Sequence, residues 1–177
     1  MKKNNEWQGS ESLRSHLVPT SSLAEDAGNA RGHKDSSIEA IAASLKRFGQ
    51  LKPIVVRNGV VIAGNGSLRA ARLLGWPSIA AVNVDHLTAH EAKAFAIADN
   101  RTAELSHWNF DVLETQLKGL KILEDDEGLL NALGFSDKEL LSLMNEAVPE
   151  TVEVAQHERV KSLTHKCPQC GFEIEGR

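Results

Sequence analysis

The chain has 177 residues, of which 41% are hydrophobic and 25% charged, a composition typical of a globular protein with one main domain. It contains no run of the ~20 apolar residues that span a bilayer, and its first residues lack the apolar stretch of a secretory signal. The net charge of −4 is unevenly spread: residues 1–75 hold eleven Lys and Arg against six Asp and Glu, whereas residues 76–158 hold five against sixteen.

This asymmetry favours an anionic partner at the basic first half, such as a nucleotide or the DNA backbone. The alternative is that the acidic helices are simply solvated. The two cysteines, Cys167 and Cys170, lie together near the end of the chain, which is typical of a reducing compartment rather than a disulfide framework. We therefore expect a cytoplasmic protein without a membrane partner.

The first elements in chain order are a tail and a helix. Residues 1–15 are polar without periodicity and are predicted to be a disordered tail. Ser36 and Glu39 have capping-box spacing, and apolar residues at helical spacing continue to Phe48. Gly49 is a typical C-terminal stop for this helix.

A hairpin, a helix and a third strand follow. Asn58-Gly59 between two β-branched runs is a strong hairpin signal. The second strand enters Gly64-Asn65-Gly66, after which a helix over 67–74 and a strand over 79–84 are predicted. Thr88 and Glu91 form a second capping box, which opens a helix to about residue 105 with an inner stripe at Phe95, Ala98, Thr102 and Leu105.

The remainder of the sequence is predicted to be helical, then unstructured. Three acidic helices cover 112–117, 129–133 and 136–144, the last opened by a Ser136–Glu139 capping box. Residues 147–164 read as a linker. The predicted organisation is a disordered tail over 1–15, an α+β domain over 16–108, a helical extension over 109–146 and a linker with a terminal Cys pair over 147–177.

The strand–Gly64-Asn65-Gly66–helix junction is a candidate phosphate site. A helix N-terminus offers unpaired N–H groups and partial positive charge, and glycines let the backbone approach a phosphate. Ser67 is placed to cap the helix or bind an anion, and Arg69 and Arg72 add charge. The alternative from local sequence is a tight strand-to-helix turn.

Two further groups carry chemistry. Asp99, Asn100 and Arg101 lie within one turn and suit Mg²⁺ and triphosphate binding, or they are ordinary charges at an exposed helix end. Cys167-x-x-Cys170-Gly171 indicates a zinc knuckle that supplies half of a four-ligand site. His165 and His157, or a second chain, are candidates to complete it; the alternative is two free thiols.

The sequence resembles the ParB amino-terminal domain, in particular its phage and mobile-element branch. The resemblance rests on motifs in family order over residues 16–145: Asn29-Ala-Arg31, Ile38-x-x-Ile41-x-x-Ser44-x-x-x-Phe48-Gly49-Gln50-x-x-Pro53-Ile54-Val55-Val56, Val61-Ile62-Ala63-Gly64-Asn65-Gly66-x-x-x-Ala70-Ala71-x-x-Leu74-Gly75, and Ala98-Asp99-Asn100-Arg101 with Glu104, Leu105 and Trp108.

The resemblance implies a fold shared with sulfiredoxin, a small mixed sheet with packed helices and a phosphate-binding strand–loop–helix. The resemblance also implies that the protein binds a nucleoside triphosphate together with Mg²⁺; in partition proteins this nucleotide is CTP. It further implies that the protein acts in association with DNA. By motif position, the nucleotide-binding residues are Arg31, Gly64, Asn65, Gly66, Ser67, Arg69, Asp99 and Asn100. Lys34, Lys46, Arg47 and Arg72 are the predicted DNA contacts.

This chain also departs from the family pattern. Asn65 stands where partition proteins have Glu and sulfiredoxins have their cysteine, which excludes sulfiredoxin chemistry. Gly66 and Ser67 replace two arginines of the partition proteins, and we expect no counterpart of the partition proteins' helix-turn-helix and dimerisation domains among residues 1–177.

We expect a ParB-like, DNA-associated protein with a nucleotide pocket, acting in partition, regulation or DNA modification of a phage or mobile element. The first alternative is a Mg²⁺-dependent nuclease or nucleotide hydrolase using Asp99, and the second is a non-catalytic protein-binding adaptor. The expected partners are DNA, a nucleotide, a second copy of the chain, and a DNA methyltransferase or another mobile-element protein.

Overall fold

The computed structural model describes residues 6–122, 127–144, 165–166 and 173–174. The chain divides into two compact units, residues 1–146 and 147–177. In the second unit, β6 (His165–Lys166) pairs with β7 (Glu173–Ile174) in antiparallel orientation. Within the described residues, every helix is too short or too polar to span a bilayer.

The first unit contains a five-stranded mixed sheet, which confirms the predicted α+β class. Its strand order is β1-β5-β3-β4-β2. The strands are β1 (Leu17–Pro19), β2 (Ala24–Glu25), β3 (Ile54–Arg57), β4 (Val60–Ala63) and β5 (Ser78–Asn83). The predicted hairpin is confirmed: β3 and β4 pair antiparallel, and Asn58 and Gly59 have φ of 48° and 77° at the turn, as a type I′ turn requires.

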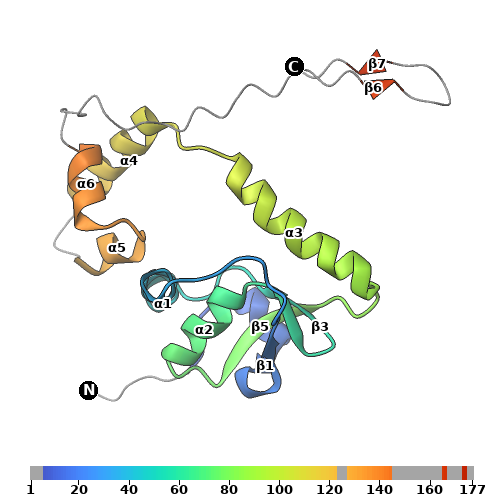
Figure 1. Ribbon diagram of the computed structural model, residues 1–177. Coiled ribbons are helices and arrows are strands. Elements are labelled where there is room, and N and C mark those ends of the chain that lie inside the picture. The colour runs from blue at the N-terminus through green and yellow to red at the C-terminus, as the bar shows by residue number, and fades with distance from the viewer. Residues whose placement is uncertain (1–5, 123–126, 145–164, 167–172, 175–177) are drawn as a thin grey trace. The chain divides into compact units, whose positions relative to one another are not determined.

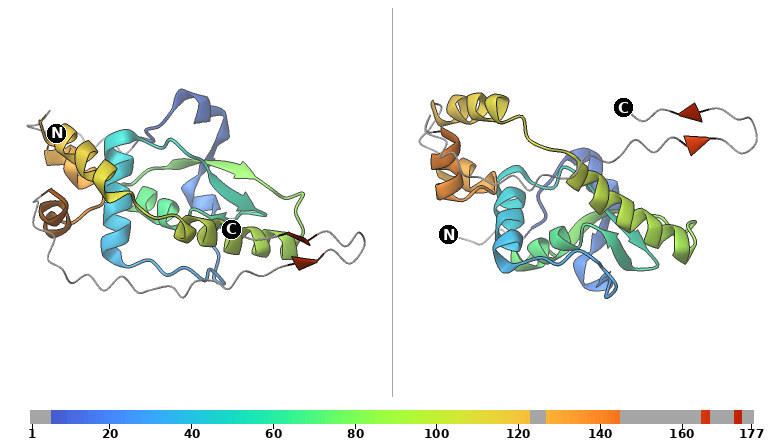
Figure 2. Two further views of the ribbon diagram at one scale, coloured as in Figure 1. Left: turned by 90° about the horizontal axis from the view of Figure 1, so that it is seen from above. Right: turned by 45° about the horizontal axis from the view of Figure 1, so that its top comes forward.

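Six α-helices accompany the sheet within residues 6–122 and 127–144. They are α1 (Asp35–Phe48), α2 (Asn65–Leu73), α3 (Ala89–Leu105), α4 (Phe110–Ile122), α5 (Glu127–Ala132) and α6 (Asp137–Met144). Helix α1 packs against α2, as Figure 1 shows, and also against α5, which lies beside it in both views of Figure 2. Helix α4 packs against α6.

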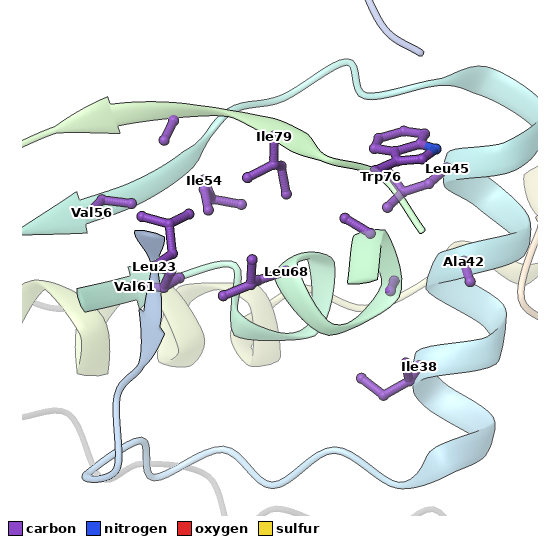
Figure 3. Close-up of a cluster of buried hydrophobic side chains, with 13 residues drawn as sticks. Leu23, Ile38, Ala42, Leu45, Ile54, Val56, Val61, Leu68, Trp76 and Ile79 are labelled. Atoms are coloured by element: carbon purple, nitrogen blue, oxygen red, sulfur yellow. The ribbon is translucent and has the colours of Figure 1, made fainter. Parts of the chain in front are cut away.

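The main core lies between the sheet and helices α1 and α2. Ile54 and Ile79 from the strands point toward Leu68 of α2, and Leu45 approaches from α1 (Figure 3). Leu68 and Ile79 are 0% exposed, and full burial of such a side chain is worth about 1.5–3 kcal/mol. A smaller cluster joins α4 to α6 through Leu113, Leu117 and Leu140, with Leu133, Phe135 and Leu143 at its edge.

Part of the predicted disordered tail is folded. Trp7 packs on the main core, and its indole Nε1–H donates to Gln50 Oε1 over 2.8 Å. Gly9 forms a β-bridge with Gln50, and a 3₁₀ helix covers Glu11–His16. The prediction was wrong for residues 6–15 because this segment is held by a partner about 40 residues away, which local periodicity does not reveal.

Three helix predictions also need correction. Helix α1 begins at Asp35, with Lys34 as N-cap and no side-chain cap, because the Lys34 carbonyl accepts from the N–H groups of Ser37 and Ile38. Ser36 and Glu39 therefore lie inside the helix. Helix α2 begins at residue 65, two residues earlier than predicted.

The third correction concerns α3. Its Thr88–Glu91 capping box is present as predicted. However, Ala92 is the one residue of α3 that is buried, and Phe95 and Leu105 of the predicted inner stripe are 38% and 63% exposed. The apolar spacing did not identify an inner face because most side chains of this helix are exposed in the described part of the chain.

Candidate functional site

A cavity of about 1010 Å³ opens beside α1. Its walls come from the loop before α1, the N-terminal half of α1, the β4–α2 junction, the end of α3 and the segment around the start of α6. The lining side chains and backbone include Asn29, Arg31, His33, Lys34, Ser36, Ser37, Glu39, Ala40, Gly64, Asn65, Gly66, Ser67, Asp99, Asn100, Asn131, Phe135, Ser136 and Glu139. Because the loop before α1 and α1 itself are continuous, these walls come from four separate segments: residues 29–43, 62–67, 99–100 and 131–139.

The β4–α2 junction is shaped by its two glycines. Gly64 is the N-cap of α2 with φ of 93°, and a Cβ there would lie 2.6 Å from Ile54 Cγ2. A Cβ at Gly66 would lie 2.8 Å from Ile41 Cδ1 and 3.0 Å from His33 Cε1. The glycines therefore let α2 begin close against β3 and α1. Since no side chain caps α2, its first N–H groups have no intrahelical acceptor.

Asn65 has a structural role at this junction. Its side chain is 5% exposed. Its Oδ1 accepts from the Asp26 N–H over 3.2 Å, and its Nδ2 donates to the Val61 carbonyl over 3.0 Å. Because both Oδ1 and Nδ2 of Asn65 are already hydrogen-bonded, only the backbone of Asn65 is available to a ligand in the cavity.

Arg31 and Asn100, which are 69 residues apart, meet at the cavity. Arg31 Nη1 donates to Asn100 Oδ1 over 3.4 Å, and Asn100 Nδ2 donates to the Ala96 carbonyl over 2.8 Å. The loop that carries Arg31 is held to α3 by Lys93, whose Nζ donates to the Gly28 carbonyl over 3.1 Å. Asp99 lines the same cavity.

Arg69 and Arg72 do not reach the cavity. Arg69 Nε donates to Glu25 Oε2 over 2.6 Å. Arg72 Nη2 donates to the carbonyls of Thr20 and Leu23 over 2.9 and 2.7 Å. These two arginines therefore bind the segment around β2 to α2.

The other predicted sites are dispersed. Lys34, predicted as a DNA contact, lines the cavity, whereas Lys46 and Arg47 lie in the last turn of α1. Of the predicted zinc ligands, His165 is in β6, and Cys167, Cys170 and His157 lie outside the described residues. In the described part of the chain, no three His, Cys, Asp or Glu side chains cluster as a metal site.

A family model described as the ParB N-terminal domain matches residues 2–101. The chain belongs to the ParB N-terminal domain family. It is 32% identical over 80 residues to the ParB-like nuclease domain-containing protein YnaK of Escherichia coli K-12, an alignment that covers 45% of this chain and 92% of YnaK.

Chromosome-partitioning ParB from Caulobacter crescentus, in its complex with CTP-gamma-S, shares this fold. The C-terminally truncated protein complexed with CTP-gamma-S gives a TM-score of 0.62, with 20% identity over 72% of this chain and 75% of that one. The truncated protein complexed to the centromeric parS site gives a TM-score of 0.42, with 19% identity over 72% and 69% of the two chains.

One wall of the cavity lies beyond the residues that match the ParB N-terminal domain. Asn131, Gly134, Phe135, Ser136 and Glu139 belong to the helical extension, and sequence reasoning assigned them no site. The only local signal was the Ser136–Glu139 capping box, which is present. The capping box predicted where a helix starts. It did not predict that α5 packs on α1, which is the contact that brings this helix start to the cavity.

Proposed function

We propose that this ParB-family chain binds a nucleoside triphosphate with Mg²⁺, CTP being the first candidate, and acts on DNA in partition, regulation or modification of a phage or mobile-element genome. The observation that carries the proposal is the meeting of the α2 N-terminus with Arg31, Asp99 and Asn100 in one cavity.

The phosphates are assigned to the start of α2. Its uncapped N–H groups and the positive end of its dipole suit an anion, and the glycines allow close approach. Arg31 and Lys34 add two positive charges to the same space. Asp99 supplies a carboxylate, and Mg²⁺ in a triphosphate complex is typically bound by one or two carboxylates together with the phosphates. Size agrees with this assignment, since ligand cavities commonly measure ~300–1,000 Å³.

Nucleotide binding is tested by titration calorimetry with CTP, UTP, ATP and GTP in Mg²⁺. Wild type is expected to bind at least one of the four. Arg31→Ala should weaken that binding by about tenfold or more, because a charge-assisted hydrogen bond to phosphate is lost. Arg14→Ala is the matched control, since Arg14 pairs with Glu11 at an exposed position and does not line the cavity. Absence of binding by all four nucleotides would refute the proposal.

DNA binding is assigned to the basic first half, with Lys34, Lys46 and Arg47 of the α1 region as the proposed phosphate contacts. Arg72 is left out of this set because its guanidinium binds two backbone carbonyls. Affinity for duplex DNA should fall steeply with salt, and Lys46→Ala should reduce the slope of log K against log salt by about 0.9. Lys138→Ala, in the acidic α6, should leave the slope unchanged.

Hydrolysis is the second candidate activity. It is favoured by the Asp99 carboxylate in the cavity and by the likeness to YnaK, whose name describes a nuclease domain. If the chain cleaves nucleotide or DNA with Mg²⁺, Asp99→Asn should abolish turnover while nucleotide still binds. A chain that binds neither nucleotide nor DNA would instead fit a protein-binding adaptor.

A further inference from the structure

The wall that the helical extension adds to the cavity carries groups suited to a nucleobase. It presents Phe135, an aromatic ring, and Glu139, a carboxylate, with Asn131 and Ser136 beside them. These residues lie outside the match to the ParB family model, which covers residues 2–101.

This wall stands across α1 from the phosphate end. A Cβ at Gly66 would meet Ile41 at 2.8 Å, whereas a Cβ at Gly134 would lie 3.8 Å from Ala40 Cβ. Consecutive residues of a helix point about 100° apart, so the α2 N-terminus and the Gly134 segment flank α1 on two sides. The floor between them carries the small side chains Ser36 and Ala40. The cavity therefore runs from the start of α2 to the wall that carries Phe135 and Glu139.

Phe135 is held in position by its own contacts. It packs against the cluster that joins α4 to α6. Its ring also lies 6.1 Å from the Trp108 ring, centroid to centroid, at an interplanar angle of 54°. A fixed aromatic ring at a cavity wall is a platform on which any base can stack.

Glu139 has one carboxylate oxygen left for a ligand. Its Oε2 accepts from the Ser136 N–H over 2.7 Å and from the Ser136 hydroxyl over 2.6 Å, while no donor among the described residues is bonded to Oε1. The Ser136 hydroxyl and then its N–H hold the pKa of Glu139 below its usual value, so the group is an ionised acceptor at neutral pH. An ionised carboxylate accepts from exocyclic amino groups of bases and repels a carbonyl oxygen in the same place.

We propose that Phe135 and Glu139 form a base-recognition subsite that selects nucleotides whose base carries an exocyclic amino group over those with a carbonyl at that position. The subsite rests on the proposed function, because the triphosphate end positions the base.

The test compares ligands that differ at one group: CTP against UTP, and ATP against ITP, each with Mg²⁺ and the full chain in a calorimeter. Wild type should prefer the amino-bearing member of at least one pair by about tenfold, the value of one charge-assisted hydrogen bond. Glu139→Gln should bring the ratio of the two affinities within that pair close to one, since an amide can donate to a carbonyl oxygen as well as accept from an amino group. Asp137→Asn, which removes a carboxylate from the same helix turn outside the cavity, should keep the ratio.

Two measurements separate the subsite from the proposed function. Phe135→Leu should weaken nucleotide binding but leave inorganic tripolyphosphate binding unchanged, whereas Arg31→Ala should weaken both. Equal binding within each pair by wild type, or a ratio that survives Glu139→Gln in a variant whose thermal midpoint matches wild type, would overturn the subsite while nucleotide binding stands. Failure of every nucleotide and of tripolyphosphate to bind would overturn both.

Discussion

Gln50 is a buried glutamine, 2% exposed, that joins three separate parts of the chain. Its Oε1 accepts from Trp7 Nε1 and from the Ala80 N–H, and its Nε2 donates to the carbonyls of Lys52 and Ala80. The side chain thus satisfies both backbone groups of a buried residue of β5 and anchors the N-terminal segment.

Gln50→Leu should therefore destabilise the first unit by about 3 kcal/mol, because the buried N–H and carbonyl of Ala80 each lose a partner. Chemical denaturation followed by circular dichroism measures this change. The control is Gln8→Leu at an exposed position, for which a change below about 0.5 kcal/mol is expected. Equal effects of the two substitutions would contradict the structural role of Gln50.

Gly64 and Gly119 give a matched pair of glycine substitutions with opposite signs. Gly64→Ala should cost at least about 1–3 kcal/mol, since the residue has φ of 93° and its Cβ would meet Ile54 at 2.6 Å. Gly119→Ala lies in α4 with no atom within 4 Å of the added Cβ, so it should stabilise by up to about 1 kcal/mol. Thermal unfolding of both variants tests the pair, and a neutral Gly64→Ala would show that the junction has room to relax.

Helices α3 and α6 both begin with a capping box read correctly from sequence, because the motif involves residues only three apart. At α3, the Thr88 hydroxyl accepts from the Glu91 N–H, and the Glu91 carboxylate accepts from the Thr88 N–H. The face that a helix buries is set by distant residues instead. Phe95 and Leu105 of the predicted inner stripe are accordingly exposed on α3.

The capping box of α3 makes stability depend on pH in acid. The Thr88 N–H and then its hydroxyl hold the pKa of Glu91 below its ordinary value of 4.5. The unfolded chain therefore binds the proton more readily, so Glu91 contributes stability that is complete above about pH 4.5 and is lost as pH falls through the lower folded pKa. Glu91→Gln preserves the hydrogen-bonded box but does not titrate. Its thermal midpoint should vary less than that of wild type between pH 6 and 3; parallel curves would exclude this contribution.

At the scale of the whole molecule, the chain consists of two units, and the second is predicted to depend on metal. Zinc binding by Cys167 and Cys170 stays a prediction, with His165 and His157 or a second chain as the remaining ligands. Elemental analysis of protein purified under reducing conditions should find about one zinc per chain for the histidine set, or about one per two chains for a shared four-cysteine site.

Chelation should leave the first unit folded, because its core is built from residues 23–81 without the cysteine pair. Chelation should convert a dimer to a monomer, as measured by light scattering, only if two chains share the zinc site. Purified protein free of zinc would refute the site, and loss of the first unit's helical signal on chelation would refute the independence of the two units.

The sequence alone determined the Asn58-Gly59 hairpin and the helix starts at α3 and α6, because each depends on hydrogen bonds or sterics within a few residues. The α+β class was predicted from the resemblance to the ParB amino-terminal domain. That resemblance also brought Arg31 and Asn100 into one predicted site through the order of the family motifs. Only the tertiary structure decided how the remaining polar groups are used. Asn65 is occupied by Asp26 and Val61, and Arg72 by carbonyls about 50 residues away. The wall around Phe135 likewise depends on α5 packing against α1, a contact between distant residues that local periodicity does not encode.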